Sequence, residues 1–227
     1  MNTALWAVLP YLALTTFAGG LVWRYRYDKL GWTARSSQLH ERRLLGLGSP
    51  LFHGGILLTA LGHATGLLIP AGVTRALGMS DGVYKAMAVG VGGLAGLMTL
   101  AGLAILVFRR LTVRAVLRAS LASDLVMYVL LGSTILIGLA ITLSGNGHDY
   151  RASVAPWFRS VFAFQPAVDA IAKAPWAFQL HALIAWTLIA AWPFTRLVHA
   201  FSLPLGYLAR PYIVYRSREA SRGQALD

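Results

Sequence analysis

The 227-residue sequence contains no cysteine and few charged residues. The lack of cysteine excludes disulfide bonds, cysteine-ligated zinc, iron–sulfur clusters held by this chain, and c-type haem, which needs a Cys-x-x-Cys-His motif. Only 12% of the residues are charged, whereas a soluble domain carries about a quarter. Hydrophobic residues make up 57% of the chain. This composition indicates a membrane protein.

Five apolar segments are each long enough to cross a bilayer, which takes roughly 20 residues. They lie at residues 4–23, 51–70, 86–108, 125–144 and 176–200, and up to residue 195 none contains Asp, Glu, Lys or Arg. We therefore expect an all-α fold, a single five-helix transmembrane bundle within residues 1–227. A carboxyl-terminal tail is expected from about residue 201.

The net charge of +12 fits either nucleic-acid binding or a membrane protein with basic loops on one side. Fifteen of the twenty Lys and Arg residues lie in the first and third connections and after residue 195. The positive-inside rule then places these regions in the cytoplasm and the amino terminus outside. We expect a multi-pass protein of the bacterial cell (inner) membrane, and no nucleic-acid partner.

Glycine spacing and one long connection predict further features. Gly92-x-x-x-Gly96 and Gly62-x-x-x-Gly66 are small-residue spacings that let helix backbones approach closely. Close approach of a flat cofactor is the alternative reading. The connection at residues 145–175 contains Trp157, Phe158, Phe162 and Phe164 and is expected to lie on the outer membrane surface as an amphipathic piece.

Four of the six histidines lie within the predicted spans, where ionisable residues are costly unless something satisfies them. His40 and His148 lie in polar connections and are most simply solvated. His53 and His63 belong to the second span, and His181 and His199 to the fifth. These two spans run in opposite directions, so the topology pairs His53 with His199 and His63 with His181.

Two imidazoles facing each other from neighbouring helices suit the iron of non-covalent b-type haem, which needs no cysteine. The helical rise does not match fully. Ten residues separate the histidines of the second span, about 15 Å, and eighteen separate those of the fifth, about 27 Å on one face. A kink expected at Pro193 would absorb part of the difference.

Several stretches resemble the gamma subunit, or cytochrome b subunit, of respiratory nitrate reductase. They are LFHGGILLTALGHATGLLIP, FQLHALIAWTLIAAWPFTRLVHAFSLPLGYLARPYIVYR, WRYRYD and SSQLHERRLL. The resemblance implies two haem b groups with ligands at His53, His63, His181 and His199. It also implies oxidation of membrane quinol near the outer haem and electron delivery to an iron–sulfur beta subunit. A molybdenum-containing alpha subunit would then reduce nitrate, in anaerobic respiration or nitrate assimilation.

Three further residues are candidate site residues, each with a simpler alternative. Lys85 opens the third span on the outer side and is a candidate to hydrogen-bond a quinol oxygen. The resemblance places a functional lysine in this neighbourhood, with Val83 at the alternative register. The alternative role of Lys85 is an interfacial lysine that snorkels. Gly62 would leave room for a haem or quinone ring. Arg196 is a candidate partner for a haem propionate, or an ordinary inside-positive anchor.

Two other functions remain open from the sequence. The chain would equally serve as the cytochrome b subunit of another quinone-linked molybdoenzyme or of a sulfur-metabolism oxidoreductase. The second possibility is a non-redox membrane transporter that uses the histidines as transient metal ligands. Transport usually requires carboxylates or a polar path within the membrane, and the predicted spans lack both.

Overall fold

The computed structural model describes residues 4–28, 37, 39–145 and 147–201, and the predicted tail lies beyond them. Five helices are long and apolar enough to cross a membrane. Within the described residues no strand occurs, so the predicted all-α five-helix fold is confirmed. The five are α1 (Leu9–Tyr27), α2 (Arg43–His63), α4 (Asp81–Thr112), α6 (Ala122–Leu143) and α9 (Trp176–Ala191).

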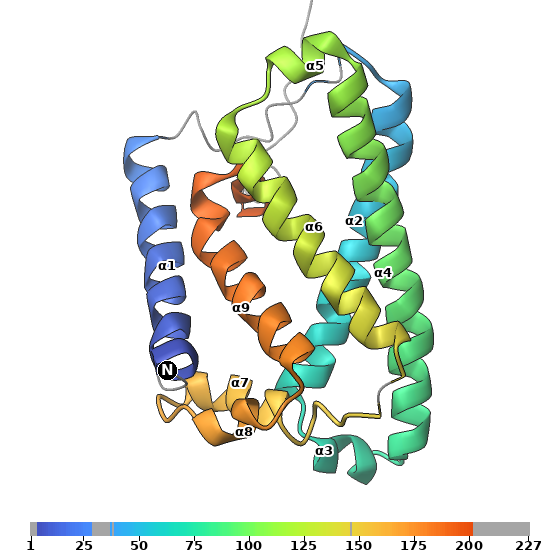
Figure 1. The fold of residues 1–227 in the computed structure, drawn as a ribbon, viewed down its shortest axis with the longest axis vertical. Helices are drawn as coiled ribbons and strands as arrows, with labels where there is room; N and C mark the ends of the chain where they lie inside the picture. Colours follow the sequence, from blue (N-terminus) through green and yellow to red (C-terminus); the bar gives the residue numbers. More distant parts are fainter. Residues whose placement is uncertain (1–3, 29–36, 38, 146, 202–227) are drawn as a thin grey trace, which may run out of the picture.

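The helices pack in the order α1, α9, α6, α4, α2 (Figure 1). The most extensive packing is between α2 and α4. Helix α6 joins this pair to α9, and α9 packs in turn against α1. The backbones of α2 and α9 do not pack closely against each other along their lengths. Helix α2 carries His53 and His63, and α9 carries His181.

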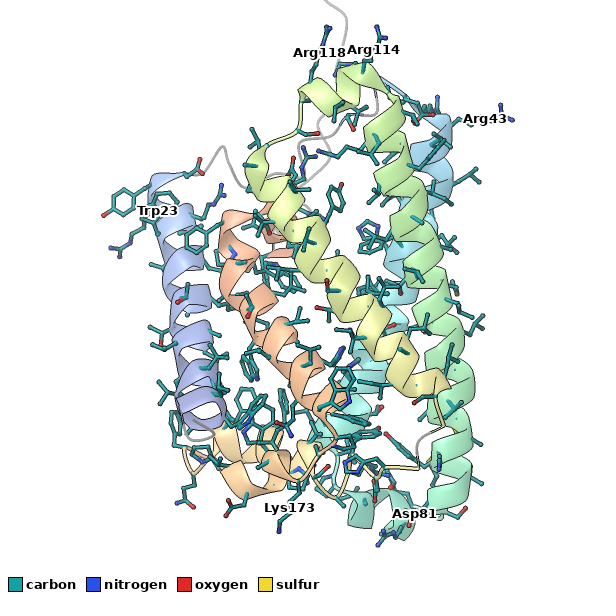
Figure 2. All side chains as sticks on the ribbon, in the orientation of Figure 1. Trp23, Arg43, Asp81, Arg114, Arg118 and Lys173 are labelled. Carbon is teal, nitrogen blue, oxygen red and sulfur yellow. The ribbon has the colours of Figure 1, made fainter. Side chains whose placement is uncertain are left out.

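Short helices close the two ends of the bundle (Figure 1). We call one end the arginine-rich end, because Arg43, Arg114 and Arg118 project from it (Figure 2); it carries α5 (Arg114–Arg118). The opposite end carries α3 (Ala71–Ala76), α7 (Val154–Phe162) and α8 (Val168–Ala172), with Asp81 and Lys173 on its surface (Figure 2). Helices α7 and α8 lie in the connection at residues 145–175, where the sequence predicts an amphipathic piece.

Aromatic packing fixes α7 under the bundle. Trp157 on α7 is 1% exposed, and its indole nitrogen donates to the carbonyl oxygen of Trp6 at 2.9 Å. The rings of Trp6 and Trp157 meet edge to face at 5.5 Å, and Trp186 of α9 contacts Trp157 from the other side. Helix α7 is therefore held by the π-helical turn Ala4–Val8 that precedes α1, and by α9.

The glycines that bring α2 and α4 together are not those of the two predicted Gly-x-x-x-Gly pairs, of which Gly66 and Gly96 lie against the side chains of Tyr150 and Leu139. A Cβ at Gly55 would lie 2.5 Å from the amide nitrogen of Thr99, and one at Gly102 would overlap the backbone of Phe52. A Cβ at Gly62 or Gly92 would meet nothing within 4 Å. Regular spacing identified glycine-rich helix faces, but which face meets a neighbour is set by the tertiary fold.

The helices also extend beyond the uncharged segments or stop short of them. Helix α2 begins at Arg43, eight residues before the predicted span, and includes Pro50. Helix α9 ends at Ala191 and is followed by two 3-10 segments, η4 (Trp192–Phe194) and η5 (Arg196–Phe201). Pro193 has no amide hydrogen to donate, which favours this break. Thr195 between the two segments is extended, so His181 and His199 do not share one continuous α-helical face.

Candidate haem site

The structure brings the four span histidines together in two pairs. The ring centroids of His53 and His199 are 6.0 Å apart with their planes at 78°, and those of His63 and His181 are 6.1 Å apart at 23°. These are the pairs that the antiparallel topology predicted. Because α9 ends at Ala191 and His199 lies in η5, the rise calculated for one continuous α-helix does not apply between His181 and His199.

Local hydrogen bonds orient three of the four rings. The Nδ1 atoms of His53 and His63 lie 2.7 and 2.8 Å from the carbonyl oxygens of Ser49 and Thr59, one turn earlier in α2. The Nδ1 of His199 lies 2.5 Å from the carbonyl oxygen of Arg196. A carbonyl can only accept, so Nδ1 carries the proton in each ring. In this tautomer Nε2 is the ring nitrogen with a lone pair that can bind a metal.

The ring of His181 is held by packing instead. Its Nδ1 is buried and faces the backbone of Thr134 on α6, but makes no hydrogen bond of standard geometry within the described residues. Gly138 of α6 lies against the same ring, because a Cβ there would be 2.8 Å from Cε1 of His181. The absence of a side chain at Gly138 therefore makes room for the imidazole.

The spacing of each pair fits an iron atom between the two rings. Two metal–nitrogen bonds of about 2 Å each, plus the inner halves of two imidazoles, place the centroids roughly 6 Å apart. Within residues 4–28, 37, 39–145 and 147–201, no group of three or more His, Cys, Asp or Glu side chains gathers. The histidines thus meet in twos, as axial ligands of haem do.

A cavity of about 350 Å³ adjoins the His63–His181 pair. Its lining is His63, Ala64, Leu67, Leu68, Phe158 and Phe162. Three of these residues belong to the π-helical turn Ala64–Leu68 that follows α2, and His63 directly precedes it. Such turns are found often at functional sites. The two phenylalanines come from α7. Arg159 of α7 donates to the carbonyl oxygen of Leu67 at 2.8 Å and so fastens α7 to this turn.

A polar cluster lies beside the same turn. The hydroxyls of Tyr84 and Tyr150 are 2.8 Å apart, and a Cβ at Gly66 would overlap the Tyr150 hydroxyl. Burial and the bond to Tyr84 raise the pKa of Tyr150 far above its ordinary 10.0, so this phenol stays protonated. Arg151 lies over the Tyr84 ring at 4.0 Å and donates to the carbonyl oxygen of Ile69. The cluster ties α4 and the long connection to the end of α2.

The other predicted site residues are placed as follows. Lys85 lies on an exposed face of the first turns of α4 and does not line the cavity, whereas its neighbour Tyr84 faces Gly66. Gly62, next to His63, is exposed with open space around its Cα. Arg196 is largely buried and donates from Nε to Asp124 at 2.5 Å.

Two residues near the histidines escaped the sequence reading. Asp124 was placed outside the fourth span, yet it lies in the first turn of α6 with 2% of its surface exposed. A lone carboxylate one residue before an apolar run was a signal for an internal ion pair, since an unpaired buried charge is costly. Gly138 gave no signal beyond being a glycine within an apolar helix.

The chain matches proteins of one family over nearly its whole length. It matches the model described as "Nitrate reductase gamma subunit" over residues 2–218. It is 45% identical to the nitrate reductase gamma chain of Bacillus subtilis over 217 residues, 94% of this chain and 97% of that one. It is 33% identical to the respiratory nitrate reductase 2 gamma chain of Escherichia coli over 222 residues, 96% of this chain and 98% of that one.

A longer relative matches as well. The chain is 52% identical over 224 residues to the "Nitrate reductase-like protein NarX" of Mycobacterium tuberculosis. The matched region covers 96% of this chain but only 34% of that protein. The chain thus spans about a third of the length of this mycobacterial relative and almost all of the two gamma chains. Together with the five apolar helices, these matches show that the chain is an integral membrane protein belonging to the nitrate reductase gamma subunit family.

Proposed function

We propose that the chain is a di-haem b membrane subunit that oxidises quinol and passes the electrons to the iron–sulfur subunit of a respiratory nitrate reductase. His53 and His199 would ligate one haem, and His63 and His181 the other. The observation that carries the proposal is the two pairs of imidazoles, with ring centroids 6.0 and 6.1 Å apart, that α2 forms with η5 and with α9, while the backbones of α2 and α9 do not pack closely. Bound there, the two haems would supply one-electron carriers at two depths in the membrane.

The residues of each pair would hold and orient the iron. Hydrogen bonds from Nδ1 to backbone carbonyls keep His53, His63 and His199 in the tautomer that presents Nε2. His53 and His63 are exposed on an apolar helix in this chain. Imidazoles facing hydrocarbon are unfavourable, and binding a cofactor between the helices would remove that cost.

Quinol would bind in the cavity beside His63. The cavity is lined almost wholly by aliphatic and aromatic side chains, as sites for apolar ligands are. Arg159 holds α7 and its two phenylalanines over the cavity through the Leu67 carbonyl. The distribution of Lys and Arg supports an outer location for this end and a cytoplasmic location for the arginine-rich end. Protons of quinol would therefore be released outside while electrons leave inward.

The roles of Lys85, Gly62 and Arg196 belong to the same proposal. Lys85 would reach a quinol oxygen from the start of α4, and Gly62 would leave room beside His63 for a ring. Arg196 would pair with a haem propionate near His199. The cytoplasmic partners would be the beta and alpha subunits of a nitrate reductase, whose chemistry this chain has no residues to perform.

Single alanine substitutions of the four histidines test the proposal. His63→Ala and His181→Ala should each remove the same haem and abolish quinol oxidation, because each leaves that iron with one ligand. His53→Ala and His199→Ala should each remove the other haem. The measurement is a reduced-minus-oxidised spectrum with haem content per chain, and a rate of quinol oxidation.

His40→Ala is the matched control, because His40 is exposed outside the spans and its loss should leave both haems in place. Loss of different haems in His63→Ala and His181→Ala would refute the pairing. Purified wild-type chain without haem absorption, despite ample haem supply, would refute the cytochrome function and leave the transporter as the better reading. The soluble subunits that co-purify distinguish nitrate reductase from another quinone-linked oxidoreductase.

A further inference from the structure

A buried charge cluster lies next to the His53–His199 pair. Asp124 of α6 accepts from Nε of Arg196 at 2.5 Å through Oδ1 and from Nη1 of Arg110 at 3.0 Å through Oδ2. Oδ2 also accepts from the backbone amide of Leu121 at 2.9 Å. Asp124 is 2% exposed, and the side chains of Arg110 and Arg196 are 10% and 14% exposed.

The cluster joins three elements, of which one carries an axial histidine. Arg110 comes from the end of α4, Asp124 from the start of α6 and Arg196 from the first residue of η5. The Arg196 carbonyl accepts the Nδ1–H of His199. Asp124 therefore fixes Arg196 through its side chain, and Arg196 fixes the His199 ring through its backbone.

The position of η5 makes this link necessary. Helix α9 ends at Ala191, and the extended Thr195 interrupts the chain before η5. A short 3-10 helix has weak hydrogen-bond geometry and little stability alone. The Asp124–Arg196 pair and the bond from the Trp192 indole to the Leu197 carbonyl at 2.7 Å supply further contacts that hold η5.

The cluster also carries charge. One carboxylate faces two guanidinium groups, so the three side chains together bear a net positive charge. Charges in a low-dielectric site interact over longer distances than in water. Reduction adds an electron, so a nearby carboxylate disfavours reduction and a nearby guanidinium favours it.

We infer that Asp124 is a positioning residue for His199, and that the cluster of Arg110, Asp124 and Arg196 tunes the reduction potential of the haem ligated by His53 and His199. This inference rests on the proposed function. It adds a residue that orients the axial ligand of one haem and leaves the other unaffected. Hydrogen bonds to a ligating residue and charges close to it are established ways to tune a metal site.

The test compares Asp124→Asn with Arg196→Gln in the full-length chain. Each is made in a His63→Ala background, where only the haem of His53 and His199 remains, and again in a His53→Ala background, where only the other haem remains. The reduction potential is measured by redox titration of the haem absorption. In the first background Asp124→Asn should raise the potential and Arg196→Gln should lower it. The reduction potential of the double variant should lie between those of the two single variants. In the second background the substitutions should change the reduction potential little.

Asp81→Asn is the control, because its carboxylate pairs with Arg75 on the surface of the opposite end. It should leave both potentials unchanged. If the Asp124→Asn variant does not accumulate, the change in reduction potential of the Arg196→Gln variant tests the inference, since that variant keeps the Asp124–Arg110 pair. No shift, shifts in the same direction, or equal shifts of both haems would overturn the inference. In that case two haems in the wild-type chain would still support the proposed function. A wild-type chain without haem would refute the proposed function itself.

Discussion

At the scale of single residues, the histidine sites depend on atoms that are absent as well as present. Three imidazoles are oriented by backbone carbonyls of their own chain segment. The fourth, His181, is oriented by the space that Gly138 leaves on the neighbouring helix. A site can thus be specified by a missing methyl group as firmly as by a hydrogen bond.

Gly138→Ala is expected to displace the His181 ring, because the new methyl group would lie 2.8 Å from its Cε1. We expect loss of the haem ligated by His63 and His181 and retention of the other, measured by haem content and difference spectra. Gly132→Ala on the same helix is the control, since its nearest neighbour would be Leu103 Cδ2 at 3.9 Å. Equal haem content in the two variants would contradict the role of Gly138.

We expect the contact of the Glu41 carboxylate at the arginine-rich end to depend on pH. Burial disfavours its charged form, but hydrogen bonds from the Leu44 amide and the Arg109 guanidinium outweigh this, and the pKa of Glu41 falls below 4.5. A lowered pKa means that the unfolded form binds more protons on acidification. The contact is therefore fully stabilising above about pH 4.5 and is lost as the pH falls through the folded-state pKa.

We expect the amides of Leu44 and Leu45, which Glu41 accepts from, to lose hydrogen-exchange protection on acidification through that range. Glu41→Gln should lack this pH-dependent step, because it has no carboxyl group to titrate. The comparison between the two proteins at each pH removes the intrinsic pH dependence of exchange. A step of the same size in both would show that another group is responsible.

At the scale of the helices, the bundle is built from a tight α2–α4 pair and a looser contact of α6 with both α4 and α9. Gly48, Gly55 and Gly102 allow the tight contact, because side chains there would meet Ile105, Thr99 and Phe52. Without a hydrophobic driving force between helices in lipid, such close backbone packing supplies much of the association energy.

Gly102→Ala is expected to destabilise the α2–α4 pair, because its Cβ would overlap the Phe52 backbone, which cannot rotate away. Overpacking of this kind costs about 1–3 kcal/mol. Thermal unfolding in detergent, followed by circular dichroism, should show a lower midpoint. Gly92→Ala, on the same helix with nothing within 4 Å, should be neutral. A larger effect at Gly92 would place the packing seam elsewhere.

The sequence predicted the five helices and the two histidine pairs because these depend on local pattern and on topology alone. Apolar length identifies a span, and antiparallel order decides which of His53, His63, His181 and His199 share a depth. It did not predict the end of α9 at Ala191 or the buried Asp124. The expected kink at Pro193 marked the region of the break but not its exact position. The burial of Asp124 depends on its ion pairs with Arg110 of α4 and Arg196 of η5, which local pattern does not reveal.

At the scale of the whole molecule, charge distinguishes the two ends of the bundle. Arg43, Arg114 and Arg118 project from one end, and the exposed Lys173 lies at the other (Figure 2). Clustered arginines resist translocation. The arginine-rich end is therefore expected in the cytoplasm, facing the soluble subunits.

Because the chain has no cysteine, single introduced cysteines report its orientation directly. A membrane-impermeant thiol reagent added to intact cells should label Lys173→Cys and not Arg118→Cys. Both should be labelled once the membrane is permeabilised. The reverse pattern in intact cells would invert the topology and place the His63–His181 pair on the inner side.

Because the backbones of α2 and α9 do not pack closely, the supply of the proposed haems would affect how much folded protein the cell keeps. In the polypeptide alone, the α2–α4 pair is joined to α1 and α9 chiefly through α6. Axial bonds from both sides would connect the two halves directly, and a ligand bound only by the folded form stabilises it. A cell starved of porphyrin would then hold a chain that separates along this line and is degraded early, so its abundance would follow haem synthesis even at constant transcription.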